Sequence, residues 1–77
     1  MEINILAFGQ VAEITGKTNW SVPYVKDTGE LRVLLEKSYP RLQSIEFAIA
    51  VNKKLISDNS ELNDKDVVAL LPPFSGG

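Results

Sequence analysis

The last six residues of the 77-residue chain, Pro72 to Gly77, form the segment with the clearest capacity for chemistry. Their sequence is P-P-F-S-G-G. The prolines fix φ and favour an extended, stiffened chain, which reaches at most about 20 Å. Gly76 and Gly77 have no side chains, so the α-carboxylate of Gly77 can enter a slot that a β-carbon would block. That carboxylate is ionised at pH 7, and it becomes reactive only when it is activated, for example by adenylation.

The alternative interpretation is a frayed chain end, because chain termini are commonly disordered. Two prolines and an aromatic residue, Phe74, directly before Ser75 and the glycines favour a functional tail instead. We therefore predict that Gly77 is the reactive residue. The residues predicted to guide it into a partner are Gly76, Ser75, Phe74, Pro73 and Pro72, together with Phe8.

The rest of the chain lacks the residues for self-contained catalysis. It has no cysteine and no histidine, which argues against a zinc site and excludes Ser-His and Cys-His nucleophiles within the chain. Lysine and arginine number eight and acids number ten, giving a net charge of −2. Such a balance argues against a nucleic-acid partner. We expect no metal and no permanently bound cofactor.

Three other groups of side chains have a functional and a structural interpretation. The acidic segment 58–66 lacks the glycine and final glutamate of an EF-hand loop, which favours a solvated turn over a calcium site. Trp20 and Tyr24 share one strand face and could stack a ligand, but packing is the commoner role. Lys53 and Lys54 read as a charged hairpin turn.

The first residues, M-E-I-N-I-L-A-F-G, carry an acid where a signal peptide needs a positive charge. Their apolar run is too short to span a bilayer. A secreted chain of this size usually carries disulfides. We therefore expect a cytoplasmic protein without membrane contact.

Apolar periodicity predicts the elements that position the tail. Residues 28–39 form the one clear helix, with Asp27 as N-cap and Pro40 as its end. Gly9 and Gly16 bracket a loop or short turn between two strands, the second at a sheet edge because it contains Pro23. The predicted strands are residues 2–8, 18–25, 47–51, 55–56 and 67–71, and segment 57–66 is a loop with one helical turn held by Leu62.

This order, β-β-α-β-β-β, predicts an α+β protein of the β-grasp, or ubiquitin-like, architecture. One main helix packs on one face of a mixed sheet, and the last strand lies centrally, parallel to the first. Residues 1–71 form the domain and residues 72–77 the tail. The predicted core residues are Ile3, Ile5, Leu31, Leu34, Leu35 and Ile49.

The opposite face of the sheet is also expected to be apolar. It is predicted to carry Ala48 and Ala50, with Leu6, Phe8, Val68 and Leu70 on the same side. A chain this short has no second layer to cover that face, so we predict a partner surface, unless side chains from the long loops cover it.

Three segments resemble the MoaD family, the small sulfur-carrying subunits of molybdopterin synthase. They are N-I-L-A-F-G-Q-V-A-E-I-T-G (4–16), A-V-N-K-K-L-I-S-D-N-S-E-L-N-D-K-D-V-V-A-L-L (50–71) and P-P-F-S-G-G (72–77). The similarity covers the whole chain. Phe74 stands where this family often has a branched aliphatic residue.

The resemblance implies a mechanism in which partners supply the catalytic groups. A ubiquitin-activating-like enzyme uses ATP to adenylate the Gly77 carboxylate, and a persulfide donor converts the adenylate to a thiocarboxylate. The tail then enters the large catalytic subunit, in a heterotetramer, where sulfur is transferred to cyclic pyranopterin monophosphate to form the molybdopterin dithiolene. On this interpretation the chain is not catalytic alone but is the small subunit of a sulfurtransferase.

Two alternatives remain open. One is another ubiquitin-like sulfur carrier, of the thiamine or tRNA-thiolation pathway, which shares the chemistry up to the thiocarboxylate. The other is a non-catalytic β-grasp interaction module whose glycines are incidental. Deletion of Gly77 separates a carrier from a module, since only a carrier depends on it.

Overall fold

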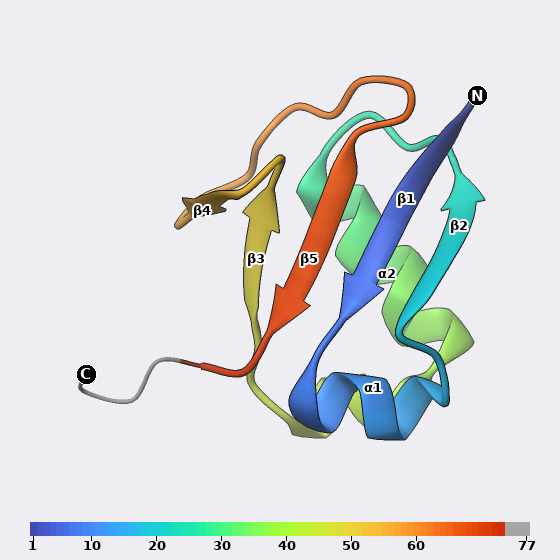
Figure 1. Ribbon diagram of the computed structural model, residues 1–77, viewed down its shortest axis with the longest axis vertical. Helices are drawn as coiled ribbons and strands as arrows, with labels where there is room; N and C mark the ends of the chain where they lie inside the picture. Colours follow the sequence, from blue (N-terminus) through green and yellow to red (C-terminus); the bar gives the residue numbers. More distant parts are fainter. Residues whose placement is uncertain (74–77) are drawn as a thin grey trace.

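The computed structural model describes residues 1–73 and places a five-stranded sheet beside its helices (Figure 1). Phe74, Ser75, Gly76 and Gly77 lie outside the described residues. The elements, in chain order, are β1 (Glu2–Ala7), α1 (Gly9–Thr15), β2 (Asn19–Pro23), α2 (Thr28–Ser38), the 3-10 helix η1 (Pro40–Ser44), β3 (Ala48–Val51), β4 (Lys54–Ile56) and β5 (Val67–Leu71).

The sheet has the strand order β2-β1-β5-β3-β4. Strands β1 and β5 run parallel at its centre, and the other neighbouring pairs are antiparallel. The crossover through α2 supplies the connection that a parallel pair requires. Strand β2 is an edge strand, as Pro23 predicted, and β5 is central, as its apolar sequence predicted. This is the predicted β-grasp fold.

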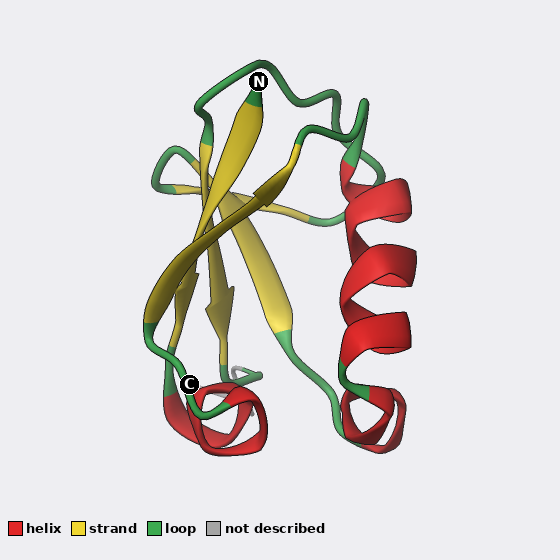
Figure 2. Cartoon of the chain, turned by 90° about the vertical axis from the view of Figure 1, so that its right-hand side faces the viewer, coloured by secondary structure: helices red, strands yellow, loops and turns green. Residues whose placement is uncertain are grey.

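One face of the sheet packs against α2, while no helix within residues 1–73 covers the other face (Figure 2). The alternation along β1 sends Ile3, Ile5 and Ala7 toward α2, and these side chains are fully or almost fully buried. Ile49 from β3 and Leu31 and Leu35 from α2 complete the centre of this core. The predicted core is therefore confirmed at five of its positions, and the sixth, Leu34, is treated below.

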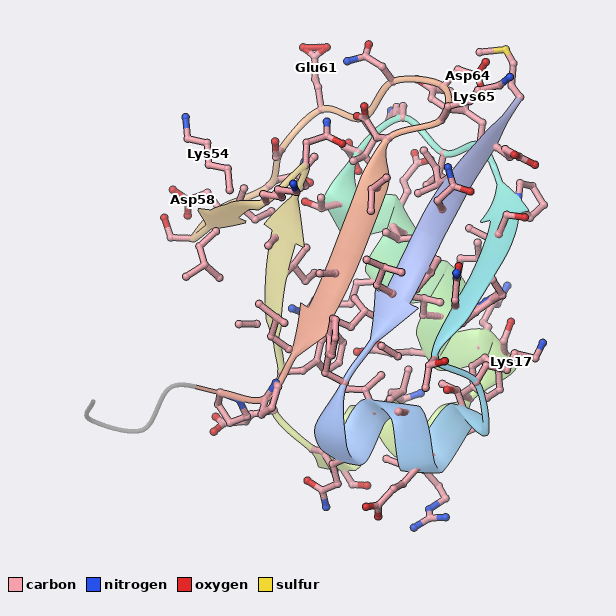
Figure 3. All side chains as sticks on the ribbon, viewed as in Figure 1. Lys17, Lys54, Asp58, Glu61, Asp64 and Lys65 are labelled. Carbon is pink, nitrogen blue, oxygen red and sulfur yellow. The ribbon has the colours of Figure 1, made fainter. Side chains whose placement is uncertain are left out.

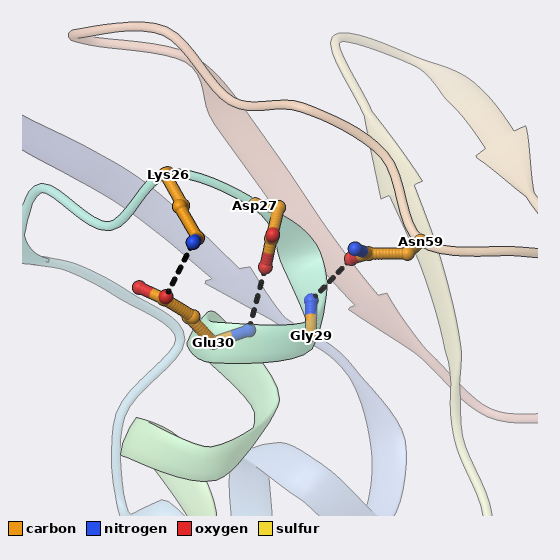
Figure 4. Close-up of polar contacts among 5 residues, drawn as sticks. All are labelled: Lys26, Asp27, Gly29, Glu30 and Asn59. Carbon is orange, nitrogen blue, oxygen red and sulfur yellow. Dashed lines mark hydrogen bonds and ion pairs between the residues drawn. The ribbon is translucent and has the colours of Figure 1, made fainter.

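Helix α2 begins where the sequence predicted. The Asp27 carboxylate accepts a hydrogen bond from the Glu30 N–H at 2.9 Å, as expected for an N-cap (Figure 4). The Glu30 carboxylate forms an ion pair with Lys26, with 3.5 Å between Oε2 and Nζ. The helix ends at Ser38, one residue before the predicted end, because Pro40 begins η1.

The prediction that Leu34 belongs to the core is wrong. Leu34 is only half-buried at the edge of the helix-sheet contact, whereas Leu31 and Leu35 are fully buried. Successive residues of an α-helix are about 100° apart around its axis. The buried stripe of α2 is centred between Leu31 and Leu35 on the side that also carries Thr28, so Leu34 falls at its margin.

The segment between β1 and β2 contains a helix, not the predicted loop or short turn. Helix α1 closes one end of the core with Val11, which is 1% exposed, and packs Ala12 and Ile14 against it. Gly16 ends the helix with φ of 72° and donates its N–H to the Ala12 carbonyl at 2.9 Å. β1 and β2 still pair antiparallel, but across a helical connection.

The long loop from Ser57 to Asp66 has no helical turn, which corrects that prediction, but Leu62 is the buried pin that was expected. The loop is tied to the start of α2 by backbone bonds from Thr28 N–H to the Ser60 carbonyl and from Leu62 N–H to the Lys26 carbonyl. The β3–β4 hairpin turn lies at Asn52 and Lys53, both with positive φ, whereas Lys54, predicted as part of the turn, begins β4. Among residues 1–73 neither α-helix is long and apolar enough to cross a membrane.

Candidate functional site

The tail leaves the molecule from the end of the central strand β5. The Leu70 carbonyl accepts a hydrogen bond from the Phe8 N–H at 3.1 Å, and Leu71 is half-buried. Pro72 and Pro73 follow and are exposed. Proline has no N–H for a ladder hydrogen bond, so the strand ends here. The predicted guiding residues Pro72 and Pro73 are thus accessible at the end of the sheet.

The remaining predicted tail residues, Phe74, Ser75, Gly76 and Gly77, lie outside the described residues, so their placement stays a prediction. Phe8 is described, and its side chain is 46% exposed. Continued alternation from Leu6 places Phe8 on the face of the sheet that α2 does not cover. Phe8 therefore lies beside the end of β5, where the tail starts, and its role in partner binding stays a prediction.

The face opposite α2 carries a row of apolar side chains across four strands, which we call the outer patch. Its members share that face through strand alternation and cross-strand pairing, and are Leu6, Ala48, Ala50, Leu55, Ala69 and Leu71. Ala69 of β5 pairs with Leu6 of β1 on one side and with Ala50 of β3 on the other. Leu55, 53% exposed, extends this row onto β4.

The outer patch leads to the tail. Leu71 pairs with Ala48 in the row closest to the end of β5, and Pro72 follows directly. The three alanines are small, so the patch is shallow and its larger side chains stand at its margins. An apolar sheet face without a covering layer is a typical partner surface. The alternative that side chains cover this face holds only in part: Ala50 is 5% exposed, whereas Leu55 and Phe8 stay about half exposed.

The prediction that Val68 and Leu70 lie on this face is wrong. Both are fully buried in the core under α2. The register with β1 decides this, because Val68 pairs with the buried Ile5 and Leu70 with the buried Ala7. The outer positions of β5 are instead Val67, Ala69 and Leu71.

The acidic segment lies away from the tail. Glu61, Asp64 and Lys65 stand at the opposite end of the sheet from the point where β5 ends, and Asp58 lies beside the β4 edge (Figure 3). Asp64 accepts a hydrogen bond from the Glu2 N–H at 2.8 Å, and Asp66 accepts bonds from Asn52 and Asn63. No group of three or more acidic side chains among residues 1–73 is arranged to hold a metal ion. Asp64 and Asp66 therefore hold backbone and side-chain groups of the loop, which is the structural interpretation.

Trp20 and Tyr24 also have the structural role. The Trp20 ring packs edge-on against Tyr39, with centroids 6.2 Å apart. The Tyr24 hydroxyl donates to the Leu62 carbonyl at 3.0 Å, which ties the end of β2 to the long loop. Both rings are partly buried against the core rather than open to a ligand.

Sequence reasoning missed one residue at this site, Gly9. It begins α1 with φ of +58° and lies against Pro72. The signal for α1 was present in the sequence, since Gly16 follows the apolar residues Val11 and Ile14 at a position typical of a helix-ending glycine. The contact between Gly9 and Pro72 arises from tertiary structure and has no local sequence signal.

Known proteins similar to this chain match it over almost its whole length. The ThiS family model matches residues 5–77. A molybdopterin synthase sulfur carrier subunit from Caenorhabditis elegans is 31% identical over 83 residues, covering 100% of this chain and 99% of that protein. A chain in the complex of subunits 1 and 2 of molybdopterin-converting factor from Helicobacter pylori is 32% identical, with a TM-score of 0.72 and full coverage of both chains.

A more distant likeness bears on the fold alone. The crystal structure of SAMP1 from Haloferax volcanii matches with a TM-score of 0.80 at 22% identity, covering 100% of each chain.

Proposed function

The chain belongs to the ThiS family and, within it, to the molybdopterin synthase sulfur carrier subunits, and we propose that it carries sulfur for molybdopterin synthesis on the α-carboxylate of Gly77. The observation that carries the proposal is the position of the tail. It follows the central strand, and its two described residues, Pro72 and Pro73, are exposed and come directly after Leu71 of the outer patch. A folded domain can thus dock through one face while its chain end enters a partner.

The proposed chemistry starts with activation of a poor electrophile. An oxygen of the Gly77 carboxylate attacks the α-phosphorus of ATP, pyrophosphate leaves, and an acyl-adenylate forms. Sulfur from a persulfide donor then attacks the acyl carbon and AMP leaves. A thiol cleaves the sulfur–sulfur bond, which leaves Gly77 as a thiocarboxylate. ATP is used by the activating enzyme, and this chain holds no permanent cofactor.

The sulfur is then passed to a pterin. We propose that the tail enters the large catalytic subunit of molybdopterin synthase, where the thiocarboxylate sulfur is transferred to cyclic pyranopterin monophosphate. Two such transfers build the dithiolene. The Helicobacter pylori complex of subunits 1 and 2 supports a large-subunit partner, because one of its chains matches this chain over its full length. A heterotetramer and a cytoplasmic location complete the proposal.

The outer patch and Phe8 are the proposed docking surface for both partners. Aromatic side chains commonly dominate the binding energy of interfaces, and Phe8 is half exposed next to the end of β5, where its N–H bonds to Leu70. The groups that catalyse each step come from the partners, since the chain has no histidine or cysteine.

Intact mass spectrometry tests the carrier chemistry directly. The chain is incubated with an activating enzyme of the ubiquitin-activating type, ATP and sodium sulfide as sulfur source. The proposal expects a mass gain equal to one sulfur minus one oxygen, located on the C-terminal peptide. The matched control is a chain that ends at Gly76. A wild-type chain whose mass stays unchanged under conditions in which a known carrier of this family is converted would overturn the proposal.

A further inference from the structure

Gly9 lies directly against Pro72, the first residue of the tail. A β-carbon built on Gly9 would lie 3.1 Å from the Pro72 Cγ and 3.8 Å from both its Cβ and its Cδ. Favourable carbon–carbon contacts lie at about 3.5–4.0 Å. The proline ring therefore occupies space that any side chain at position 9 would need.

Phe8, the neighbour of Gly9, makes a second contact with the end of β5. Phe8 donates its N–H to the Leu70 carbonyl at 3.1 Å. Phe8 and Gly9 join β1 to α1, and α1 is fixed on the core by Val11, which is 1% exposed. Leu70 is thus held by a hydrogen bond and Pro72 by a ring contact, both from the two-residue connection Phe8–Gly9.

We propose that Gly9 is a positioning residue for the C-terminal tail: by admitting the Pro72 ring against the start of α1, it sets the direction in which the chain leaves β5. The inference rests on the proposed function, in which the Gly77 carboxylate must reach a reaction centre inside a partner. The Pro72 ring fixes its own φ, so a displaced ring redirects the residues after it. Positioning errors of about 1 Å can cost about 100-fold in rate.

The test compares Gly9→Ala with Gly16→Ala. Both glycines have left-handed backbone, with φ of +58° and +72°, so each substitution introduces similar backbone strain. A β-carbon at Gly16 meets no atom within 4 Å, whereas at Gly9 it meets Pro72. Chemical denaturation gives the loss in free energy of unfolding that the strain causes in each variant. The rate of acyl-adenylate formation responds in addition to where the tail is placed.

We expect Gly9→Ala to lower kcat for adenylation by about tenfold, within the range that misplaced reacting groups produce. KM should change less than twofold, because the outer patch is intact. Gly16→Ala should leave both constants within twofold of wild type. Equal kcat values for the two variants would overturn the proposal.

Pro72→Ala provides the rescue, because it removes the Cγ and Cδ that a β-carbon at position 9 would meet. In a Pro72→Ala background, adding Gly9→Ala should change kcat by less than twofold. A Gly9→Ala effect of the same size in both backgrounds would show that the proline ring is not involved, and would overturn the proposal.

Nuclear magnetic resonance tests the contact between Gly9 and Pro72 independently of the carrier function. Wild type should show nuclear Overhauser contacts between the Gly9 Hα protons and the Pro72 ring. Gly9→Ala should shift the resonances of Leu71 and Pro73, and Gly16→Ala should not. A wild-type chain that accepts no AMP counts against the carrier function, while missing contacts or unshifted resonances count against the role of Gly9.

Discussion

Asn59 caps helix α2 from a loop that is 30 residues away in sequence: its Oδ1 accepts a hydrogen bond from the Gly29 N–H at 2.7 Å (Figure 4). The same oxygen accepts a bond from the Thr28 hydroxyl at 3.1 Å. The Thr28 hydroxyl oxygen in turn accepts the Ser60 N–H at 3.0 Å. The long loop and the helix therefore satisfy each other's backbone groups.

Asn59→Ala should lower the free energy of unfolding by about 1–2 kcal/mol, the range for losing a helix cap and leaving its donors unpaired. Urea denaturation measures the loss. Asn63→Ala is the matched control in the same loop, because Asn63 contributes a backbone N–H rather than its side chain to the described hydrogen bonds. Equal losses for the two variants would contradict the capping role.

Leu31→Ala should destabilise the protein by about 2–5 kcal/mol, as expected for truncating a fully buried leucine. Leu34→Ala, on the same helix and with the same chemistry, should cost clearly less because Leu34 is half-buried. The difference in urea midpoint between the two variants is the measurement. A larger loss for Leu34→Ala would return Leu34 to the core and contradict the facing of α2.

The lowered pKa of Asp27 makes the folded protein less stable at acid pH. The hydrogen bond from the Glu30 N–H, aided by the Asn59 side chain, holds the pKa of Asp27 below its ordinary value of 3.8. A lowered pKa means that the contribution to stability is present above pH 3.8 and is lost as pH falls through the folded-state pKa.

Asp27→Asn keeps a good N-cap but removes the titrating group. The stability advantage of wild type over Asp27→Asn should therefore shrink as the pH is lowered from neutral through the lowered pKa of Asp27. Urea denaturation over that range measures the difference. Parallel stability curves for the two proteins would show that Asp27 does not titrate with a lowered pKa.

The sequence predicted α2 well because its signals are local. Asp27 caps the start of the helix by accepting the Glu30 N–H, and Pro40 ends it because proline disfavours helical backbone in the residue before it. β5 shows the opposite case. Its sequence, V-V-A-L-L, is apolar at every position, so alternation does not decide which residues face the core. Pairing with β1 decides it, and a single sequence does not state that pairing.

Helix α1 and the tail contact escaped prediction for a related reason. α1 has seven residues and an N-cap, Phe8, without a side-chain hydrogen bond, so only its end, at Gly16, carries a local signal. Gly9 has a role only because folding brings Pro72 against it. The chemistry proposed for the tail rests on residue types alone, while the contact between Gly9 and Pro72 depends on two segments that are distant in sequence.

Phe8→Ala should weaken binding to the large subunit of molybdopterin synthase by about tenfold or more, as expected for an aromatic anchor at an interface. Val33→Ala is the control. Val33 is 58% exposed but lies on α2, on the opposite side of the sheet from the outer patch. Titration calorimetry measures both affinities. A loss for Val33→Ala with none for Phe8→Ala would move the docking surface to the helical side.

Deletion of Gly77 should abolish sulfur transfer without changing the free energy of unfolding. The deletion withdraws the terminal carboxylate by about 3.3–3.6 Å, which is well beyond the 1 Å or so of misplacement that costs about 100-fold. Gly76→Ala keeps the chain length, so it should impair transfer less completely. Stability should be unchanged in both, because β5 and the core end at Leu71. The assay is formation of the pterin dithiolene by carrier that was first treated with activating enzyme, ATP and a sulfur donor, then mixed with the large subunit. A chain lacking Gly77 that transfers sulfur at the native rate would contradict the carrier function and favour an interaction module.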